Sequence, residues 1–93
     1  MFYLYILINQ NGLKTYTGVT DNLDRRIQEH NKGKVKSSEP YTPYELLHSE
    51  CFVSLGEVME REKFYKSTTG RRKLRNFVIL WKQTKRLVES AET

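Results

Sequence analysis

One acidic residue in the second half of the chain occupies a position where a carboxylate is unusual. The segment 54–68, SLGEVMEREKFYKST, has the composition of a helix, in which Leu55, Val58, Met59 and Glu62 recur at the spacing of one helical face. Three of the four are apolar, so the pattern predicts that this face packs inward and carries Glu62 with it. A buried carboxylate persists only when it is paired, hydrogen-bonded or bound to a metal ion. Glu62 is therefore either a metal ligand or one half of an ion pair with a neighbouring Arg or Lys.

Tyrosines whose hydroxyls can handle a proton gather near the N-terminus. Residues 3–9 and 14–19 are rich in β-branched and aromatic types and flank Asn11-Gly12, which predicts a hairpin with a two-residue loop. The predicted partners are Gln10–Leu13, Ile8–Thr15, Leu7–Tyr16, Ile6–Thr17 and Tyr5–Gly18. Directly opposed residues point to the same side of a sheet. One face therefore carries Tyr3, Tyr5, Leu7, Tyr16 and Gly18, and the glycine opposite Tyr5 leaves a gap that a ligand can approach.

The segment from about Asn22 to Lys32 predicts a helix that follows the hairpin. Thr20 or Asp21 is its expected N-terminal cap, and Gly33 is its expected stop. The next segment, 33–43, is polar, contains two prolines and is expected to be a loop.

Two arginines on this helix are adjacent in sequence but point in different directions. Leu23 and Ile27 define the buried stripe, and Arg26 and His30 flank it at i, i+4, so both are expected at the edge of the sheet. Arg25 points roughly opposite and is expected to face water. The alternative for Arg26 is an ordinary surface ion pair. For His30 it is a contact with the carbonyl groups at the helix end.

The remaining elements complete an α+β pattern. Residues 44–52 form a third strand, in which His48 is expected to be structural, and a capping box at Ser54 and Glu57 starts the Glu62 helix, which Gly70 can end. A last helix over about 71–89 buries Leu74, Phe77, Val78, Trp81 and Val88. The predicted fold is a three-stranded antiparallel sheet flanked by helices, in the order β-β-α-β-α-α, within one domain spanning residues 1–93.

The charge of the chain favours an anionic partner. The formal net charge is +5, with 16 Lys and Arg against 11 Asp and Glu. One stretch without an acidic residue holds seven basic ones: Arg71, Arg72, Lys73, Arg75, Lys82, Lys85 and Arg86. A phosphate backbone is the expected target, and a solvated basic face is the alternative.

Other classes of protein are disfavoured by the composition. The single Cys51 cannot form an intramolecular disulfide, and no Cys-x-x-Cys or His/Cys cluster predicts a structural zinc site. The opening apolar run FYLYILI is too short to span a bilayer and is typical of a strand. A cytoplasmic location is expected.

The order and spacing of these motifs resemble a known family. Tyr3-Leu4-Tyr5, then Tyr16-Thr17-Gly18, then Arg26 on the following helix and Glu62 on a later one, are similar to the GIY-YIG nuclease superfamily. The runs 16–33 and 61–67, followed by Gly70-Arg71, look most similar to its small single-domain branch. That branch is often described as similar to the N-terminal nuclease domain of the bacterial excision-repair endonuclease. The resemblance covers roughly residues 3–75, and the basic helix over 71–89 extends beyond it.

The resemblance implies roles for five residues. The tyrosine that ends the first motif maps to Tyr5, and the tyrosine that opens the second maps to Tyr16. The catalytic arginine maps to Arg26, the metal-binding glutamate to Glu62, and the histidine of this branch to His30.

The chain departs from the family pattern at two places. Tyr3-Leu4 replaces Gly-Ile in the first motif, which concerns backbone packing more than chemistry. Val19 stands where the repair enzyme has a lysine after the second motif, so any role of that lysine is absent here or supplied by another residue.

The chemistry of phosphodiester cleavage fits the same residues. The reaction needs an activated water, a divalent cation on the phosphate and a further positive charge. Glu62 can supply one ligand to Mg²⁺ or Mn²⁺, and Arg26 can bind phosphate oxygens. Tyr16 or Tyr5 can order or deprotonate the water, and Tyr16 is favoured, with Tyr5 in support. The alternative for the tyrosines is ordinary sheet packing.

The expected function is a metal-dependent endonuclease acting on DNA, including branched or damaged DNA, in repair or recombination. RNA is the alternative substrate, and a protein partner can supply specificity that a chain of this size lacks. The expected nucleic-acid contacts are Arg25, Lys66, Arg71, Arg72, Lys73 and Arg75. Two other functions compete with this one. The first is a catalytically weak nucleic-acid-binding module, and the second is a regulatory protein whose basic helix binds an acidic protein.

Overall fold

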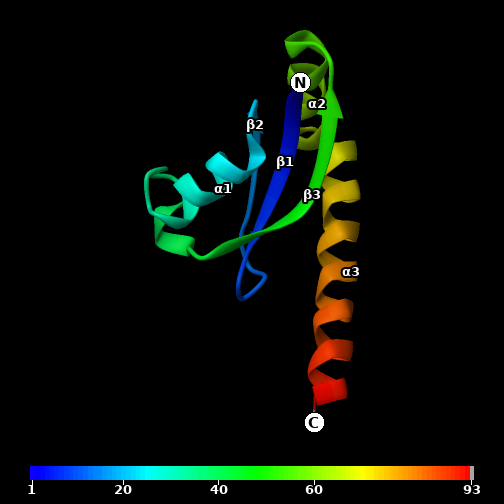
Figure 1. The fold of residues 1–93 in the computed structure, drawn as a ribbon. Coiled ribbons are helices and arrows are strands. Elements are labelled where there is room, and N and C mark those ends of the chain that lie inside the picture. The colour runs from blue at the N-terminus through cyan, green and yellow to red at the C-terminus, as the bar shows by residue number, and fades with distance from the viewer. Residues whose placement is uncertain (93) are drawn as a thin grey trace.

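The predicted α+β fold is confirmed. The computed structural model describes the backbone of residues 1–92 and the side chains of residues 1–88. The elements in chain order are β1 (Phe2–Asn9), β2 (Thr15–Thr20), α1 (Leu23–Asn31), the short 3₁₀ helix η1 (Glu39–Tyr41), β3 (Tyr44–Phe52), α2 (Leu55–Lys66) and α3 (Thr68–Glu92) (Figure 1).

Strand β1 is the centre of an antiparallel sheet with the order β2-β1-β3. The predicted hairpin register is confirmed, since Tyr5 pairs with Gly18 and Leu7 with Tyr16. The turn is longer than the predicted two residues, because the strands end at Asn9 and begin again at Thr15. The side chain of Asn9 accepts hydrogen bonds from two backbone N–H groups of the turn and replaces the expected Gln10–Leu13 pair.

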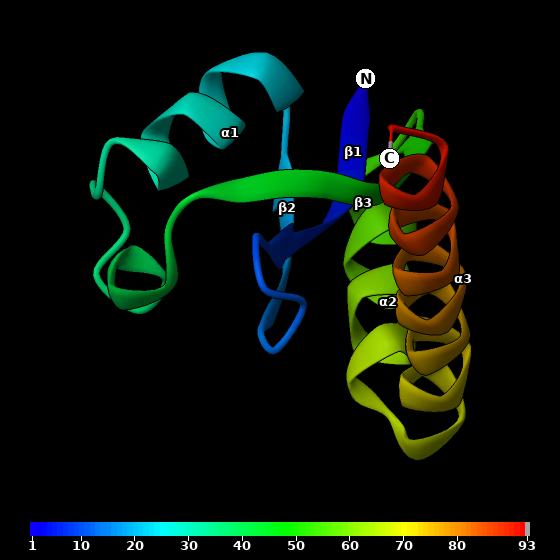
Figure 2. The ribbon, with the colours of Figure 1, turned by 90° about the horizontal axis from the view of Figure 1, so that it is seen from below.

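Helices cover both faces of the sheet (Figure 2). Helix α1 lies against one face, and α2 and α3 lie against the other. Because side chains alternate along a strand, β1 supplies both cores. Leu4 and Ile6 pack with Val58 and Tyr65 on the α2 side. On the α1 side the core contains Tyr5, Leu7 and Tyr44, with Tyr16, Leu23 and Ile27 against it.

Helix α1 begins and ends through local side-chain and backbone contacts. Its N-terminal cap is Asn22, whose side chain accepts a hydrogen bond from the backbone N–H of Arg25. The prediction of Thr20 or Asp21 as the cap is therefore wrong, because Thr20 is the last residue of β2 and its hydroxyl bonds to Asn22. The predicted stop at Gly33 is confirmed, with a φ of +76° and its N–H bonded to the carbonyl of His30.

Helix α2 packs through a different stripe from the predicted one. Leu55 and Met59 are exposed, whereas Val58 and Tyr65 are fully buried. The helix is therefore rotated about its axis relative to the predicted orientation, because Val58 and Tyr65 make the apolar contacts with β1. The predicted cap at the N-terminal end of α2 is confirmed, because the Ser54 hydroxyl oxygen accepts a hydrogen bond from the backbone N–H of Glu57.

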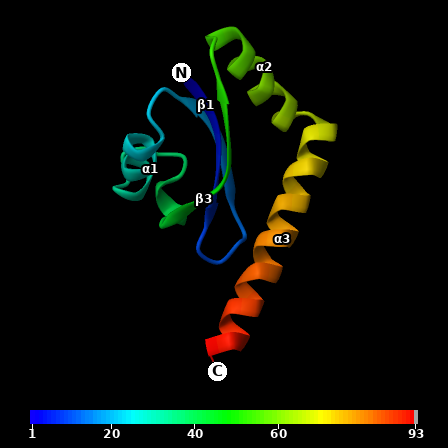
Figure 3. The same cartoon turned by 45° about the vertical axis from the view of Figure 1, so that its right-hand side comes forward.

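Helix α3 starts earlier than predicted, and Gly70 lies inside it. The chain breaks at Ser67, which is extended and whose hydroxyl accepts a hydrogen bond from the Gly70 N–H. Gly70 is buried because α3 crosses the end of α2 at this point, and a Cβ there would lie 1.8 Å from the carbonyl oxygen of Phe64. Figure 3 shows α3 leaving α2 and running past the hairpin. Val88, predicted to be buried, is exposed on this projecting part.

Candidate active site

The hydroxyl group of Tyr5 connects two elements on the α1 side of the sheet. Tyr5 comes from the central strand, and Arg26 and His30 come from α1. The Arg26 Nε–H donates to the Tyr5 oxygen at 3.2 Å, and His30 Nε2 lies 3.0 Å from that oxygen. The predicted placement of Arg26 at the sheet is thus observed. His30 is fully buried and contacts side chains rather than the carbonyl groups of the helix end.

The hydrogen bonds around His30 assign its tautomer. Ser38 donates its hydroxyl proton to the carbonyl of Val35, so its oxygen accepts from His30 Nδ1 at 2.7 Å. Nε2 then carries no proton and accepts from the Tyr5 hydroxyl. A chain of donors consequently runs from Arg26 through Tyr5 and His30 to Ser38. Ser38 was not expected from the sequence, because only the fold of the 33–43 segment brings this serine beneath α1.

The electrostatics agree with a neutral His30 and a protonated Tyr5. Burial raises the pKa of Tyr5, the hydrogen bond and charge of Arg26 oppose this shift, and the charges of Tyr16 and Glu62 add to it. Burial lowers the pKa of His30, and the nearby Arg26 charge lowers it further. The hydrogen bond to Tyr5 raises the pKa of Arg26 most. Tyr5 is therefore held protonated as a donor to His30.

Tyr16 is the more accessible of the two tyrosines. Its ring stacks on Tyr5 with 6.3 Å between centroids and meets the His30 ring edge-on at 4.5 Å. It is half-buried, whereas Tyr5 is 1% exposed. The predicted gap at Gly18 is absent, because a Cβ there would lie 2.5 Å from the Tyr5 hydroxyl oxygen. Glycine is required at this position to admit the Tyr5 side chain rather than a ligand.

Glu62 lies on α2, the helix that packs on the other face of the sheet from α1. Its side chain is 20% exposed, and its charge is the smallest of the influences on the raised pKa of Tyr5. Lys66, one turn later, lies 3.6 Å from Glu62 and is 59% exposed. Glu62 is thus neither deeply buried nor held by an equally buried cation.

The donor set suits a weakly held hard cation. Among the described residues, no group of three His, Cys, Asp or Glu side chains comes together. A metal ion at Glu62 would therefore have one carboxylate ligand and keep most of its waters. Mg²⁺ commonly binds in this way, and Mn²⁺ accepts the same oxygen ligands.

The predicted nucleic-acid contacts lie outside this cluster. Arg25 faces water and pairs with Asp21 at 2.8 Å, as its direction on the helix predicted. Four of the other five are exposed on the first turns of α3, namely Arg71, Arg72, Lys73 and Arg75. Lys66 pairs with Glu62, as described above.

A second polar cluster lies on the opposite face of the sheet and was not predicted. Glu50 accepts hydrogen bonds from Arg61 at 2.7 Å and from the hydroxyl of Tyr65, and His48 lies 2.8 Å from it. The His48 ring also stacks on Phe77. These contacts are in keeping with the structural role expected of His48. This cluster anchors α2 to β3 through Arg61, the residue that precedes Glu62, and so fixes the direction in which Glu62 points.

The motifs and this geometry agree with the comparisons to known proteins. The model of the GIY-YIG catalytic domain matches residues 1–76. The chain belongs to the GIY-YIG family. Similar GIY-YIG relatives include a UPF0213 protein of Haloquadratum walsbyi, 38% identical over 76% of this chain and 80% of that protein. Another, from Streptococcus agalactiae, is 40% identical over 77% of this chain and 82% of that protein.

One solved structure is also similar. It is the solution NMR structure of a UPF0213 protein from Bacillus halodurans, with 35% identity, coverage of 82% of this chain and 84% of that one, and a TM-score of 0.48. In the part of this GIY-YIG chain that the structure describes, no helix is long and apolar enough to span a membrane.

Proposed function

We propose that the protein is a metal-dependent endonuclease that hydrolyses phosphodiester bonds in DNA. The observation that carries the proposal is the Tyr5 hydroxyl, which is hydrogen-bonded to Arg26 and His30 beside the Tyr16 ring. The charge of Glu62 also acts on the pKa of Tyr5. This set combines a cation, a carboxylate and an accessible phenol. Those are the groups that water attack on a phosphodiester needs. The similarity to the nuclease domain of the excision-repair enzyme favours a role in repair or recombination.

Each residue has a distinct role in this proposal. Arg26 bonds to Tyr5 through Nε and lies 3.4 Å from Glu29 through Nη1, so its remaining N–H groups are left for phosphate oxygens. Tyr16 orders the attacking water or accepts its proton. Tyr5 and His30 hold Arg26 and Tyr16 in place. Glu62 would hold Mg²⁺ or Mn²⁺, which would supply positive charge to offset the negative charge that develops on the phosphate.

The family lysine that is missing at Val19 is the main argument for the alternative of a weakly catalytic binding module. The side chain of Val19 packs against the core on the α2 side. It lies on the opposite face of the sheet from Tyr16, as the strand alternation requires. The test therefore has to measure both cleavage and binding.

Nicking of supercoiled plasmid with added Mg²⁺ or Mn²⁺ tests the proposal. Glu62→Gln keeps the shape of the side chain and removes its charge, and we expect it to abolish nicking while DNA binding persists. Glu60→Gln is the matched control, because Glu60 lies on the exposed side of α2 and is 77% exposed. Metal-independent nicking, or full activity of Glu62→Gln, would refute the proposal.

A stability measurement separates loss of chemistry from loss of fold. Lys66 is exposed, so removing its partner should cost at most about 1 kcal/mol. The melting temperature of Glu62→Gln without metal should equal or exceed that of the wild type, because functional charges often reduce stability. A loss of about 3–5 kcal/mol, the cost of breaking a buried pair, would assign Glu62 a structural role instead.

Substrate preference is addressed by a panel of branched, nicked and flapped DNAs with added Mn²⁺, and a matching RNA. We expect cleavage of DNA with low sequence preference, because the described part of the chain offers no separate recognition domain. Cleavage of RNA alone would correct the substrate class.

A further inference from the structure

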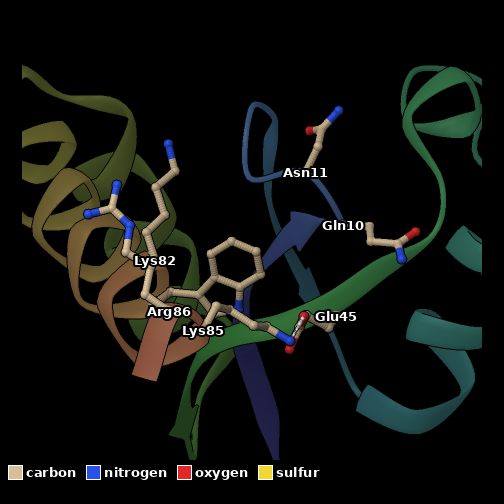
Figure 4. A pocket seen from close by; sticks show the side chains of 7 residues that line it. Gln10, Asn11, Glu45, Lys82, Lys85 and Arg86 are labelled. Atoms are coloured by element: carbon tan, nitrogen blue, oxygen red, sulfur yellow. Dashed lines mark ion pairs between the residues drawn. The ribbon is translucent and has the colours of Figure 1, made fainter. Parts of the chain in front are cut away.

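A cavity of about 360 Å³ opens between the hairpin turn and α3, away from the tyrosine cluster. The turn contributes Gln10 and Asn11 on one side, and α3 contributes its basic side chains on the other (Figure 4). Glu45 of β3 and Trp81 complete its walls. The pocket combines amide, indole and cationic groups from three elements.

We call this cavity the hairpin pocket. Its two sides are held together by a close contact between the turn and α3. Gly12 is buried although it lies at the tip of a turn, because α3 covers it. A Cβ at Gly12 would lie 2.9 Å from Cζ3 of Trp81 and 3.0 Å from Cε of Lys82. Its φ of +74° also favours glycine. The turn thus packs directly against α3, and the shape of the hairpin pocket exists before any ligand binds.

The charge of the hairpin pocket is strongly positive. Three cations line it, Lys82, Lys85 and Arg86, against one carboxylate. That carboxylate, on Glu45, is neutralised by Lys85 at 3.0 Å. Lys85 also lies 5.3 Å above the centre of the Trp81 ring, so its position is fixed by two contacts. Among the side chains of residues 1–88, no carboxylate lies within ion-pair distance of Lys82.

A hydrogen-bond donor is also left over at this site. The indole N–H of Trp81 is buried and has no acceptor among the described residues. An unpaired buried donor is costly, and because the indole nitrogen has almost no exposed surface, a ligand oxygen could reach it only if the Trp81 side chain shifted. The hairpin pocket thus has a surplus of positive charge, which the negative charge of a phosphate would balance.

We propose that the hairpin pocket binds a backbone phosphate of DNA, at a position separate from the tyrosine cluster. This inference rests on the proposed function for the identity of the ligand. The hairpin pocket contains no tyrosine, and its one carboxylate is paired, so it binds DNA without cleaving it. The hairpin pocket therefore adds a second DNA contact further along α3, beyond the basic residues on the first turns of that helix.

Trp81 is the only tryptophan in the chain, so its fluorescence reports on the hairpin pocket. The experiment titrates a short DNA duplex into metal-free protein at several salt concentrations, following both Trp81 emission and binding. The variant is Lys82→Gln/Arg86→Gln, in which two exposed charges are removed. The control is Lys36→Gln/Lys63→Gln, which removes the same charge from exposed positions elsewhere. Thermal melting checks that all proteins remain folded.

For the wild type and the control we expect a saturable change in Trp81 emission that follows DNA binding. Lys82→Gln/Arg86→Gln should lose this change and bind more weakly, with the slope of log K against log salt reduced in magnitude by about 2. Equal affinity and slope for variant and wild type would overturn the inference. A comparable emission change with polyglutamate would assign the pocket to an acidic protein, and the same change with inorganic phosphate alone would assign it to a free anion. Either result also overturns the inference.

The inference and the proposed function fail in different ways. DNA binding that changes Trp81 emission, without cleavage under any divalent metal, refutes the nuclease and supports the hairpin pocket. Metal-dependent cleavage with no response of Trp81 to DNA supports the nuclease and refutes the hairpin pocket. Absence of any DNA binding by the wild type refutes both.

Discussion

The hydroxyl of Tyr5 lies 3.0 Å from Nε2 of His30, and both side chains are fully buried between β1 and α1. The contact joins residues that are 25 positions apart in the chain. It fixes the depth and rotation of α1 on the sheet, because α1 also carries Arg26 to the same hydroxyl. The geometry of the proposed phosphate-binding arginine therefore depends on which imidazole nitrogen holds the proton, and Ser38 sets that choice.

Ser38→Ala tests this dependence. The substitution leaves the buried His30 Nδ1–H without an acceptor, which should cost about 1–3 kcal/mol of stability. It should also raise the fraction of the other tautomer, which NMR of the imidazole nitrogens measures directly. Ser37→Ala is the control, since Ser37 is exposed. If the two variants have the same tautomer ratio and cleavage rate, Ser38 does not position His30.

The pH dependence of His30 follows from its lowered pKa. Burial and the Arg26 charge put the folded pKa below the ordinary value of 6.5, so the folded state binds fewer protons than the unfolded chain as the pH falls. Its contribution to stability is complete above about pH 6.5 and is lost as the pH falls toward the folded pKa. Titration of the His30 resonance by NMR should give a midpoint below 6.5, and a midpoint above it would contradict the assignment.

The two tyrosines should respond differently to loss of the hydroxyl. Tyr16→Phe should reduce single-turnover cleavage by about 10²–10⁴-fold, the usual range for removal of a general base, with little change in melting temperature. Tyr5→Phe leaves Arg26 Nε and His30 Nε2 without a partner, so it should also lose about 1–3 kcal/mol of stability. A larger rate loss in Tyr5→Phe at unchanged stability would reverse the two roles, and full activity of both variants would make them packing residues.

Arg25 is an internal control for Arg26. The two are adjacent and identical in type, but Arg26 reaches Tyr5 and Arg25 pairs with Asp21 in solvent. Arg26→Ala should abolish turnover, and Arg25→Ala should cause only a modest, salt-dependent loss of DNA affinity. Cleavage rates and DNA affinities measured at two salt concentrations separate these outcomes. Equal effects on turnover would contradict the site.

The features that the sequence predicted well are local or periodic. The hairpin register follows from Asn11-Gly12 and the alternation of the strands, so the shared face of Tyr5 and Tyr16 was predictable. The directions of Arg25 and Arg26 follow from helix geometry alone. Each of these inferences uses residues that lie within one element or one hairpin.

The features that the sequence did not predict depend on contacts between distant segments. Ser38 reaches His30 through an irregular segment, and Glu50 reaches Arg61 and Tyr65 across β3 and α2. The apolar stripe of α2 was misassigned for the same reason. Leu55 and Met59 fit a helical period, but burial was decided by what the sheet presents to the helix. Periodicity gives the angle between side chains and leaves open which of them faces a partner.

The Glu50 cluster should make stability depend on acid pH. Burial acts to raise the pKa of Glu50, but hydrogen bonds from Arg61, Tyr65 and His48 outweigh it and lower the pKa to about 2. The depressed pKa means that the stabilisation is complete above about 4.5 and is lost as the pH falls toward 2. Glu50→Gln should cost about 1–3 kcal/mol at neutral pH, because one carboxylate oxygen becomes an NH₂ group and Arg61 or Tyr65 then loses its acceptor, and the negative charge beside Arg61 is removed.

Chemical denaturation across this pH range measures the effect. The difference in unfolding free energy between the wild type and Glu50→Gln should shrink as the pH is lowered from 4.5 toward 2. Glu60→Gln, whose carboxylate is exposed, should show little difference at any pH. A Glu50→Gln penalty that is independent of pH in this range would mean that the cluster stabilises α2 by packing and not by charge.

Two glycines in the helices give the final test, since adding the same methyl group should have opposite effects. A Cβ on Gly70 would meet the backbone carbonyl oxygen of Phe64 at 1.8 Å, so α3 would have to move away from the end of α2. Such overpacking against backbone costs about 1–3 kcal/mol or more. A Cβ on Gly56, in α2, would have no atom of the described residues within 4 Å, and Gly56→Ala should stabilise the helix by about 0.5–1 kcal/mol. Urea denaturation of both variants measures these changes. Cleavage assays of Gly70→Ala show whether the altered packing of α2 against α3 also affects Glu62, which lies two residues before Phe64. Equal stabilities of the two variants would contradict the close crossing of α2 and α3.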